Sequence, residues 1–183
     1  MGKSANEVSS REAMSAADVR RAIVRIAHEI IERNHGVEGL AIVGLQRGGT
    51  WIAEEIAAQI NQIEKSVEVP VGALDVSLHR DDIGLRPVSL GAISSIPFDL
   101  SGATVVVVDD VLFTGRTVRA AMEGLNNYGR PRAVQLAVLI DRGHRELPIR
   151  PDFVGKNLPT HRGDEVSVTS QGVLITPFVD AKS

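Results

Sequence analysis

Residues 105–117 read VVVVDDVLFTGRT, and this stretch constrains the fold more than any other part of the chain. Four consecutive β-branched residues are typical of a strand that is buried on both faces. Asp109 and Asp110 follow this run directly, and the turn Thr114–Thr117 comes shortly after them. Because burying two carboxylates without a purpose is costly, we expect the pair to emerge at the end of a buried strand.

Amphipathic helices are predicted between the apolar strands. Ser15 and Asp18 have the spacing of a capping box, and the helix that they begin should end near Gly36. One apolar stripe runs along this helix, at Val19, Ile23, Ile26 and Ile30. Further helices are predicted at 50–62 and 116–127, and strands at 40–43, 67–78, 104–108, 133–140, 152–154, 166–169 and 173–175.

This alternation indicates an α/β fold with a doubly wound, mostly parallel sheet flanked by helices. We expect residues 1–14 to be a flexible N-terminus, 15–183 to form a single domain, and 81–97 to be a long irregular loop. In such sheets ligands bind at the carboxyl ends of the strands. Those ends hold the segments 46–49, 109–117 and 141–145.

Composition excludes several classes of protein. The chain has no cysteine, which removes disulfides, thiolate catalysis and cysteine-bound metal. No apolar run approaches the roughly 18 residues that a membrane span needs, and the N-terminus lacks the apolar core of a signal peptide, so we expect a soluble, cytoplasmic protein. The net charge of −3 does not suggest nucleic acid, but residues 130–162 carry seven Arg or Lys against three acids, which predicts a basic patch.

The turn Thr114–Thr117 has the properties of an anion site. It joins a buried strand to a helix N-terminus, where backbone N–H groups, the helix dipole and two hydroxyls favour a phosphate. It matches neither the P-loop nor the dinucleotide fingerprint. Asp109 and Asp110 should point to opposite sides of the strand, which disfavours an acid/base dyad and favours binding of a ribose diol, directly or through Mg²⁺. The alternative to an anion site is an ordinary strand–helix turn whose residues only cap the helix.

Together these features resemble the signature of type I phosphoribosyltransferases, which bind 5-phosphoribosyl-1-diphosphate (PRPP). The segments RRAIVRIAHEIIERN, DVSLHRDD and AVLIDRGHRELPIRPDFVGKNLPT narrow the resemblance, over about residues 16 to 180, to the PyrR family. Its members are bifunctional: they are uracil phosphoribosyltransferases and also regulate pyrimidine genes by binding mRNA leader RNA. The resemblance therefore implies PRPP and uracil as substrates, UMP as product, Mg²⁺ as cofactor, and a homodimer or higher homo-oligomer.

The resemblance also assigns roles to positions. Asp109, Asp110 and Arg80 would be the catalytic residues, with Mg²⁺ held at the two aspartates mostly through PRPP. PRPP would contact these aspartates and Val108, Val111, Leu112, Phe113, Thr114, Gly115, Arg116, Thr117, Gln46, Arg47 and Asp81. The base pocket would include Asp141, Arg142, Gly143 and His144. One departure concerns the loop after the first strand, where Gly48 stands in the place of an Arg that family members carry in Thr-Arg-Gly.

RNA binding is predicted from two sets of cations. Arg21, Arg25 and His28 lie within about 60° of one another on the helix face opposite the apolar stripe, and Arg145, Arg150 and Lys156 lie in the basic segment. The alternative for the helix is the charged outer face of any amphipathic helix. A salvage enzyme without RNA regulation, possibly for a purine base, is the alternative function.

Overall fold

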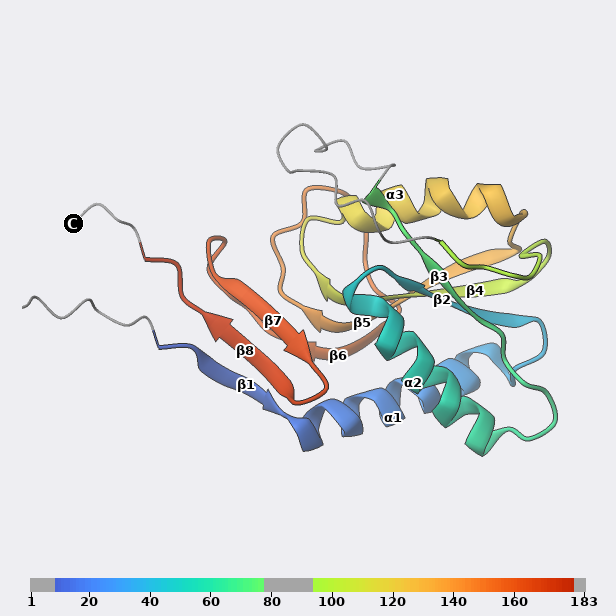
Figure 1. Cartoon of the computed structure of the whole chain (residues 1–183), viewed down its shortest axis with the longest axis horizontal. Helices are drawn as coiled ribbons and strands as arrows, with labels where there is room; N and C mark the ends of the chain where they lie inside the picture. The colour runs from blue at the N-terminus through green and yellow to red at the C-terminus, as the bar shows by residue number, and fades with distance from the viewer. Residues whose placement is uncertain (1–8, 78–93, 180–183) are drawn as a thin grey trace, which may run out of the picture.

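The computed structural model describes residues 9–77 and 94–179, and it confirms the predicted α/β class (Figure 1). A five-stranded parallel sheet with the order β3-β2-β4-β5-β6 forms the centre. Its strands are β2 (Leu40–Leu45), β3 (Val71–Leu74), β4 (Thr104–Leu112), β5 (Ala133–Asp141) and β6 (Phe153–Asn157). Helices α1 (Ala16–Asn34) and α2 (Gly48–Ile63) cover one face, and α3 (Arg116–Leu125), continued by the 3₁₀ turn η3 (Asn126–Tyr128), covers the other.

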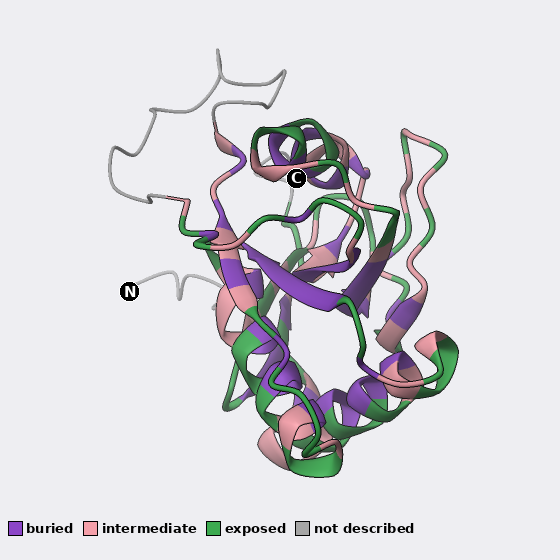
Figure 2. Ribbon diagram, turned by 90° about the vertical axis from the view of Figure 1, so that its right-hand side faces the viewer, coloured by how far each residue is buried: buried purple, intermediate pink, exposed green. Residues whose placement is uncertain are grey.

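Strand β4 is the centre of the sheet and separates two apolar clusters. Val106 and Val108 pack into the cluster beneath α1 and α2, whereas Val105 and Val107 pack into the cluster beneath α3. All four side chains are buried, as the unbroken valine run predicts. Figure 2 shows the same arrangement, with the central strands buried and the outward faces of the helices exposed.

Helix α1 begins and is oriented as its sequence predicts. The Ser15 side chain accepts the Asp18 backbone N–H, the Asp18 carboxylate accepts the Ser15 backbone N–H, and the whole predicted apolar stripe is buried. The helix ends at Asn34, within the predicted region 34–36, and its left-handed C-cap is His35, at φ 55°, where the sequence favoured Gly36. The Gly36 N–H then reaches back to the Ile31 carbonyl, which closes the last turn.

A second sheet, which the sequence did not predict, lies beside α1. Strand β1 (Arg11–Ser15) pairs antiparallel with β8 (Gly172–Thr176), which pairs with β7 (Glu165–Thr169). The expectation that residues 11–14 belong to a flexible N-terminus is therefore wrong. A short polar strand whose partner lies some 160 residues away leaves no local signal, and the burial of Met14, Val173 and Ile175 in the α1–α2 cluster anchors the small sheet.

Two strand boundaries also differ from expectation, and one of them changes the site. The segment 67–78 is a strand only over Val71–Leu74. Strand β4 continues past Val108 to Leu112, because its pairing with β5 runs on as far as Asp141. The aspartate pair therefore lies within the strand rather than beyond it. Of the predicted loop 81–97, Ser95 forms a bridge with Ala73, and residues 81–93 lie outside the described ranges.

Among the helices of residues 9–77 and 94–179, none combines the length and the apolar character that crossing a membrane requires.

The capping box of α1 leads to a prediction for stability. Replacing Ser15→Ala removes the cap, and we expect it to lower the free energy of unfolding at pH 7 by about 1 kcal/mol. Hydrogen bonds from the Ser15 side chain and backbone lower the pKa of Asp18 from 3.8 to about 2. Because a depressed pKa stabilises the fold above pH 3.8 and loses this effect as pH falls towards 2, the deficit of the variant should shrink in acid.

Urea denaturation at pH 7 and at several values between 5 and 3 measures both effects. Ser10→Ala is the matched control, because Ser10 is exposed and its hydroxyl makes a surface hydrogen bond with the Thr176 hydroxyl, 2.8 Å away. A deficit for Ser15→Ala that grows in acid would contradict the assignment.

Candidate active site

Four polar segments meet at the carboxyl end of the central sheet. They are the loop 46–49 after β2, the aspartate pair in β4, the turn 113–117 after β4, and the segment 141–145 after β5. These strands are parallel neighbours, so their carboxyl ends lie at one edge. Direct bonds join the last two segments: the Arg142 backbone N–H donates to the Leu112 carbonyl at 3.1 Å.

The two aspartates directly follow the valines of β4. The Asp110 carboxylate points towards the N-terminus of α2, where it lies against Gly48, and the alternation of side chains along a strand places Asp109 on the other side. Asp109 is 7% exposed, and Asp110 is half-buried. The backbone N–H of Asp110 donates to the Asp109 carboxylate at 3.0 Å, and that of Val111 to the Asp110 carboxylate at 2.7 Å. The arrangement agrees with the prediction that the pair is no acid/base dyad.

The loop after β2 touches the aspartate pair because it contains two glycines. A Cβ on Gly49 would lie 2.2 Å from the Val108 carbonyl oxygen, and one on Gly48 would lie 2.0 Å from an Asp110 carboxylate oxygen. The N-terminus of α2 therefore packs against the end of β4 at a distance that no larger residue allows. Gly48, which departs from the family pattern, provides the space in which the Asp110 carboxylate lies.

The rest of this loop is held by β3. The Gln46 N–H donates to the Leu74 carbonyl at 2.9 Å, and the Gln46–Arg47 peptide bond is cis. The two residues predicted to contact the diphosphate thus stand beside the aspartate pair, directly before the first turn of α2.

The turn Thr114–Thr117, called here the phosphate loop, lies at the N-terminus of α3. Gly115 has φ +94°, a left-handed conformation that glycine adopts without strain, and α3 begins at the next residue. The first N–H groups of a helix have no acceptor within the helix, and its dipole is positive at this end. With the hydroxyls of Thr114 and Thr117, the phosphate loop has the groups that bind a phosphate.

The segment that follows β5 holds the phosphate loop in place. The Thr114 carbonyl accepts N–H groups from Glu146 at 3.0 Å and Leu147 at 3.2 Å. The Glu146 carboxylate pairs with Arg116, 2.9 Å away, and with Arg162. Hydrogen bonds from Arg116 and then Arg162 lower the pKa of Glu146 below its ordinary value, so its charge is present at neutral pH.

Two of the predicted base-pocket residues surround Phe113. The Arg142 guanidinium lies 4.3 Å from the centre of the Phe113 ring, and the His144 ring meets it edge-on at 5.7 Å. Arg142 also donates to the Thr160 hydroxyl and the His161 carbonyl, and a His144 ring nitrogen lies 2.7 Å from the Thr160 carbonyl. Burial lowers the pKa of Arg142, and the Asp164 carboxylate opposes this shift. Both side chains thus connect the segment after β5 to residues 160–161.

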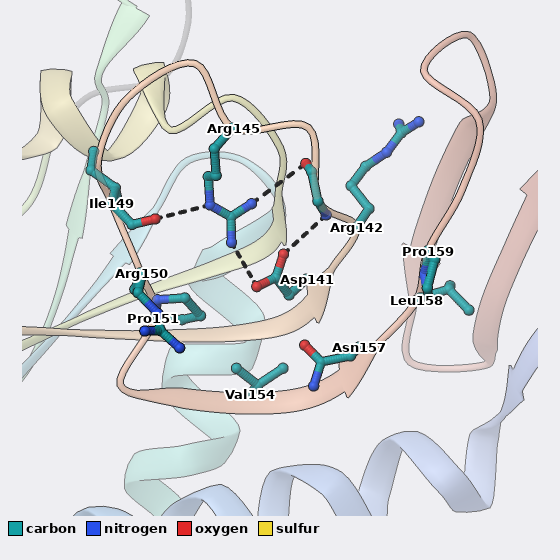
Figure 3. A pocket seen from close by; sticks show the side chains of 11 residues that line it. Asp141, Arg142, Arg145, Ile149, Arg150, Pro151, Val154, Asn157, Leu158 and Pro159 are labelled. Atoms are coloured by element: carbon teal, nitrogen blue, oxygen red, sulfur yellow. Dashed lines mark hydrogen bonds and ion pairs between the residues drawn. The ribbon is translucent and has the colours of Figure 1, made fainter.

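The other predicted base-pocket residues line a cavity of about 530 Å³ at the β6 side of the sheet (Figure 3). Asp141, Arg142 and Gly143 contribute to one wall, and residues 145, 149–151, 154 and 157–159 form the rest. His144 is not among the lining residues. Asp141 and Gly143 thus line only the cavity, His144 contacts only Phe113 of these two features, and Arg142 takes part in both.

The cations predicted to bind RNA fall into two groups. Arg21, Arg25 and His28 are exposed on α1, and Arg25 donates to the carbonyls of Val154, at 3.0 Å, and Gly155 in β6. Lys156 of β6 is also exposed, and it donates to the carbonyl of Ala13 at 2.8 Å. These four residues, called here the α1–β6 cations, thus share one surface. Arg150 is exposed at the cavity, whereas Arg145 is bonded inwards.

The structure adds contacts to the site that the sequence did not show, and two of the predicted site residues fall outside the part of the chain that it describes. Sequence reasoning missed Glu146 and Arg162, and it missed the close approach of Gly49 to Val108, because these partners lie 16 to 60 positions apart and no local pattern marks them. Arg80 and Asp81 lie outside the described residues.

The aspartate pair offers two carboxylates as ligands for a metal ion. Within residues 9–77 and 94–179, no group of three or more His, Cys, Asp or Glu is placed to bind a metal ion. Mg²⁺ in phosphoryl-ligand sites typically takes one or two carboxylates and completes its shell with water and substrate phosphates. Asp109 and Asp110 fit that donor set, which agrees with the general use of Mg²⁺ and PRPP by phosphoribosyltransferases.

A phosphate loop after an acidic strand end, in a doubly wound sheet, defines the class of phosphoribosyltransferases. Residues 14–171 match the Phosphoribosyl transferase domain family. The chain is 58% identical to Bifunctional protein PyrR of Roseiflexus sp. strain RS-1, over 86% of each chain, and 58% identical to Bifunctional protein PyrR of Brevibacillus brevis, over 92% of this chain and 94% of that one. The chain belongs to the PyrR family of phosphoribosyltransferase-domain proteins, and it is by that membership a pentosyltransferase.

Solved structures confirm the fold. A hypoxanthine phosphoribosyltransferase of Trypanosoma cruzi matches with a TM-score of 0.73 at 19% identity, over 93% of this chain and 97% of that one. A hypoxanthine phosphoribosyltransferase of Staphylococcus aureus matches with a TM-score of 0.63, also at 19% identity, over 81% and 77%. At 19% identity this similarity shows a shared fold, and it does not show which base this chain uses.

The contact between α2 and β4 leads to a second prediction. Gly49→Ala places a methyl group against the Val108 backbone, which cannot move aside, and we expect a loss of about 1–3 kcal/mol in the free energy of unfolding. Gly48→Ala is the matched comparison, because its methyl meets the end of the Asp110 side chain, which can rotate. Urea denaturation of both variants should therefore show the larger loss for Gly49→Ala, and equal losses would contradict the close approach.

Proposed function

We propose that the chain transfers the 5-phosphoribosyl group of PRPP to N1 of uracil, giving UMP and diphosphate. The observation that carries this proposal is the pairing of the phosphate loop with the aspartates of β4. The phosphate loop would bind the 5′-phosphate, and Asp109 and Asp110 would bind the ribose hydroxyls. Arg47, beside the Asp110 carboxylate in the loop after β2, would contact the diphosphate.

The reaction requires no covalent nucleophile from the protein. The bond between ribose C1′ and the diphosphate oxygen breaks, the bond from C1′ to uracil N1 forms, and the N1 proton passes to solvent water. Mg²⁺ bound with PRPP would neutralise charge on the diphosphate leaving group. The protein side chains would hold the sugar and phosphate and keep water from the cationic sugar, so positioning and electrostatic stabilisation would supply most of the rate enhancement.

The choice of uracil rests on membership of the PyrR family, since the phosphate loop and aspartates serve any base. A purine base is the nearest alternative because solved structures with this fold include hypoxanthine phosphoribosyltransferases. The cavity wall formed by Asp141, Arg142 and Gly143 would lie on the base side of the site.

Parallel assays with four bases test the reaction. With PRPP and Mg²⁺, we expect turnover with uracil to exceed that with orotate, hypoxanthine and adenine, measured as nucleotide formed. Turnover with a purine alone would overturn the assignment of uracil as the base and leave that of the PRPP site intact.

Asp109→Asn combined with Asp110→Asn should remove measurable UMP formation while the circular dichroism spectrum is retained. Undiminished turnover in that variant would contradict the role of the aspartates.

We also propose that the protein regulates pyrimidine genes in the cytoplasm, as a homodimer or higher homo-oligomer, by UMP-dependent binding to mRNA leader RNA. The α1–β6 cations favour this second function because residues from two distant parts of the chain form one exposed basic surface. Arg150 would extend the surface at the cavity.

Acidic neighbours reduce the charge of this surface in the free protein. Arg21 pairs with Asp18, and Arg25 lies 3.4 Å from Glu29. Exposed ion pairs of this kind contribute only about 0–1 kcal/mol each. RNA phosphates can therefore replace the carboxylates at small cost, and binding would depend strongly on salt.

The RNA proposal predicts a dependence on both UMP and charge. UMP should tighten binding to the leader of a pyrimidine transcript, and Arg21→Ala with His28→Ala should weaken it by at least tenfold at low salt, measured by filter binding. Arg130→Ala, an exposed cation before β5 at the opposite end of the sheet, is the control and should bind as wild type. No binding by wild type at low salt would reject the regulator and leave a salvage enzyme.

A further inference from the structure

The order of the strands decides from which side a base reaches the ribose. Strands β2 and β5 flank β4 on opposite sides, so the loop 46–49 and the segment 141–145 lie on opposite sides of the aspartate pair. A displacement at ribose C1′ joins the entering nitrogen on the face opposite the departing diphosphate, where the reacting orbitals align. In the proposed function the diphosphate lies at the loop 46–49, so the base enters from the side of β5 and β6.

Residues 160–162 belong to this side of the site. The Arg142 guanidinium holds them by donating to the Thr160 hydroxyl at 3.0 Å and to the His161 carbonyl at 2.8 Å. The same guanidinium lies 4.3 Å from the centre of the Phe113 ring, and it points away from the cavity wall (Figure 3). Residues 160–162 are therefore fixed to the residue that directly precedes the phosphate loop.

The Arg162 side chain extends from here towards the same ring. Its guanidinium carbon lies 5.9 Å from the centre of the Phe113 ring, and one terminal nitrogen pairs with the Glu146 carboxylate. The side chain is 64% exposed, so the guanidinium lies at the mouth of the site and not in the core. Glu146 also pairs with Arg116 of the phosphate loop, at 2.9 Å. One carboxylate thus places Arg162 beside the loop that would bind the sugar phosphate.

A guanidinium in this position suits the flat face of a base. It is planar, remains charged at physiological pH, and stacks on aromatic rings. Arg142 is buried and bonded to residues 160–161, so it cannot move onto a base. Arg162 can do so, because an exposed ion pair such as the one it makes with Glu146 is weak.

We propose that Arg162 is a base-contacting residue, whose guanidinium stacks on the flat face of uracil as the ring approaches C1′. This inference rests on the proposed function, in which the diphosphate departs towards the loop 46–49. Stacking needs an aromatic ring but no particular pattern of hydrogen bonds. Arg162 therefore supplies affinity for the base, and the cavity wall at Asp141 and Gly143 would supply the choice between bases.

Three substitutions at Arg162 separate its planar shape from its charge. Arg162→Ala removes both, Arg162→Lys keeps only the charge, and Arg162→Phe keeps only a flat stacking surface. At saturating PRPP, we expect the alanine and lysine variants to raise KM for uracil by roughly fivefold or more, and the phenylalanine variant to stay within about twofold of wild type. The values of kcat and of KM for PRPP should change by less than about threefold, since stacking binds the base equally in the ground and transition states.

Arg130→Ala, Arg130→Lys and Arg130→Phe are the matched controls. Arg130 is an exposed arginine before β5, at the opposite end of the sheet, and its variants should behave as wild type. Thermal unfolding of every variant is measured alongside. A purely structural role of the pair between Arg162 and Glu146 would raise KM for both substrates in all three Arg162 variants, phenylalanine included, and that result would overturn the proposal.

Two further outcomes would also overturn it. A lysine variant with the wild-type KM for uracil would show that charge alone suffices, and a rise confined to KM for PRPP would place Arg162 on a phosphate. The wild type separates the two levels of inference. A wild type that forms no UMP from PRPP, Mg²⁺ and uracil overturns the proposed function and this inference together, whereas normal wild-type turnover with an unchanged Arg162→Ala overturns this inference alone.

Discussion

The burial of β4 on both faces is the constraint on which the rest of the structure depends. Its valines fill the two apolar clusters on opposite sides of the sheet, so no charge fits along Val105–Val108. Asp109 and Asp110 follow this run directly. Because β4 pairs with β2 and β5 in parallel, the loops after these strands reach the same edge, and the aspartates become the centre of a site instead of a defect in the core.

Close approach and polar contacts then give this edge its shape. On one side, Gly48 and Gly49 allow α2 to pack against the end of β4. On the other, the segment after β5 bonds to the phosphate loop through Arg145, Glu146 and Leu147. Rigid support of this kind is what a phosphate-binding loop needs, since its affinity depends on several N–H groups and hydroxyls keeping fixed directions.

The parts that could be predicted from sequence are those with a local physical cause. An apolar stripe and a capping box define α1, and the valine run with its two acids defines the centre of the sheet and of the site. The small sheet could not be predicted, because β1 has its partner at the far end of the chain. The inward direction of the Arg145 guanidinium, towards Asp141 and the Phe113 carbonyl, could not be predicted either, because a sequence shows the charge of an arginine but not where its side chain points.

The sequence alone determined the fold class and the place of the candidate anion site and of the aspartate pair, because periodicity, β-branching and turn chemistry act between residues close along the chain. It also carried the family resemblance that relatives at 58% identity confirm. Tertiary structure decided which cations meet, as in the contact between Arg25 and β6, and which are withdrawn, as in the Arg145–Asp141 pair. Contacts between distant segments depend on how the layers pack, and that packing is a property of the whole chain.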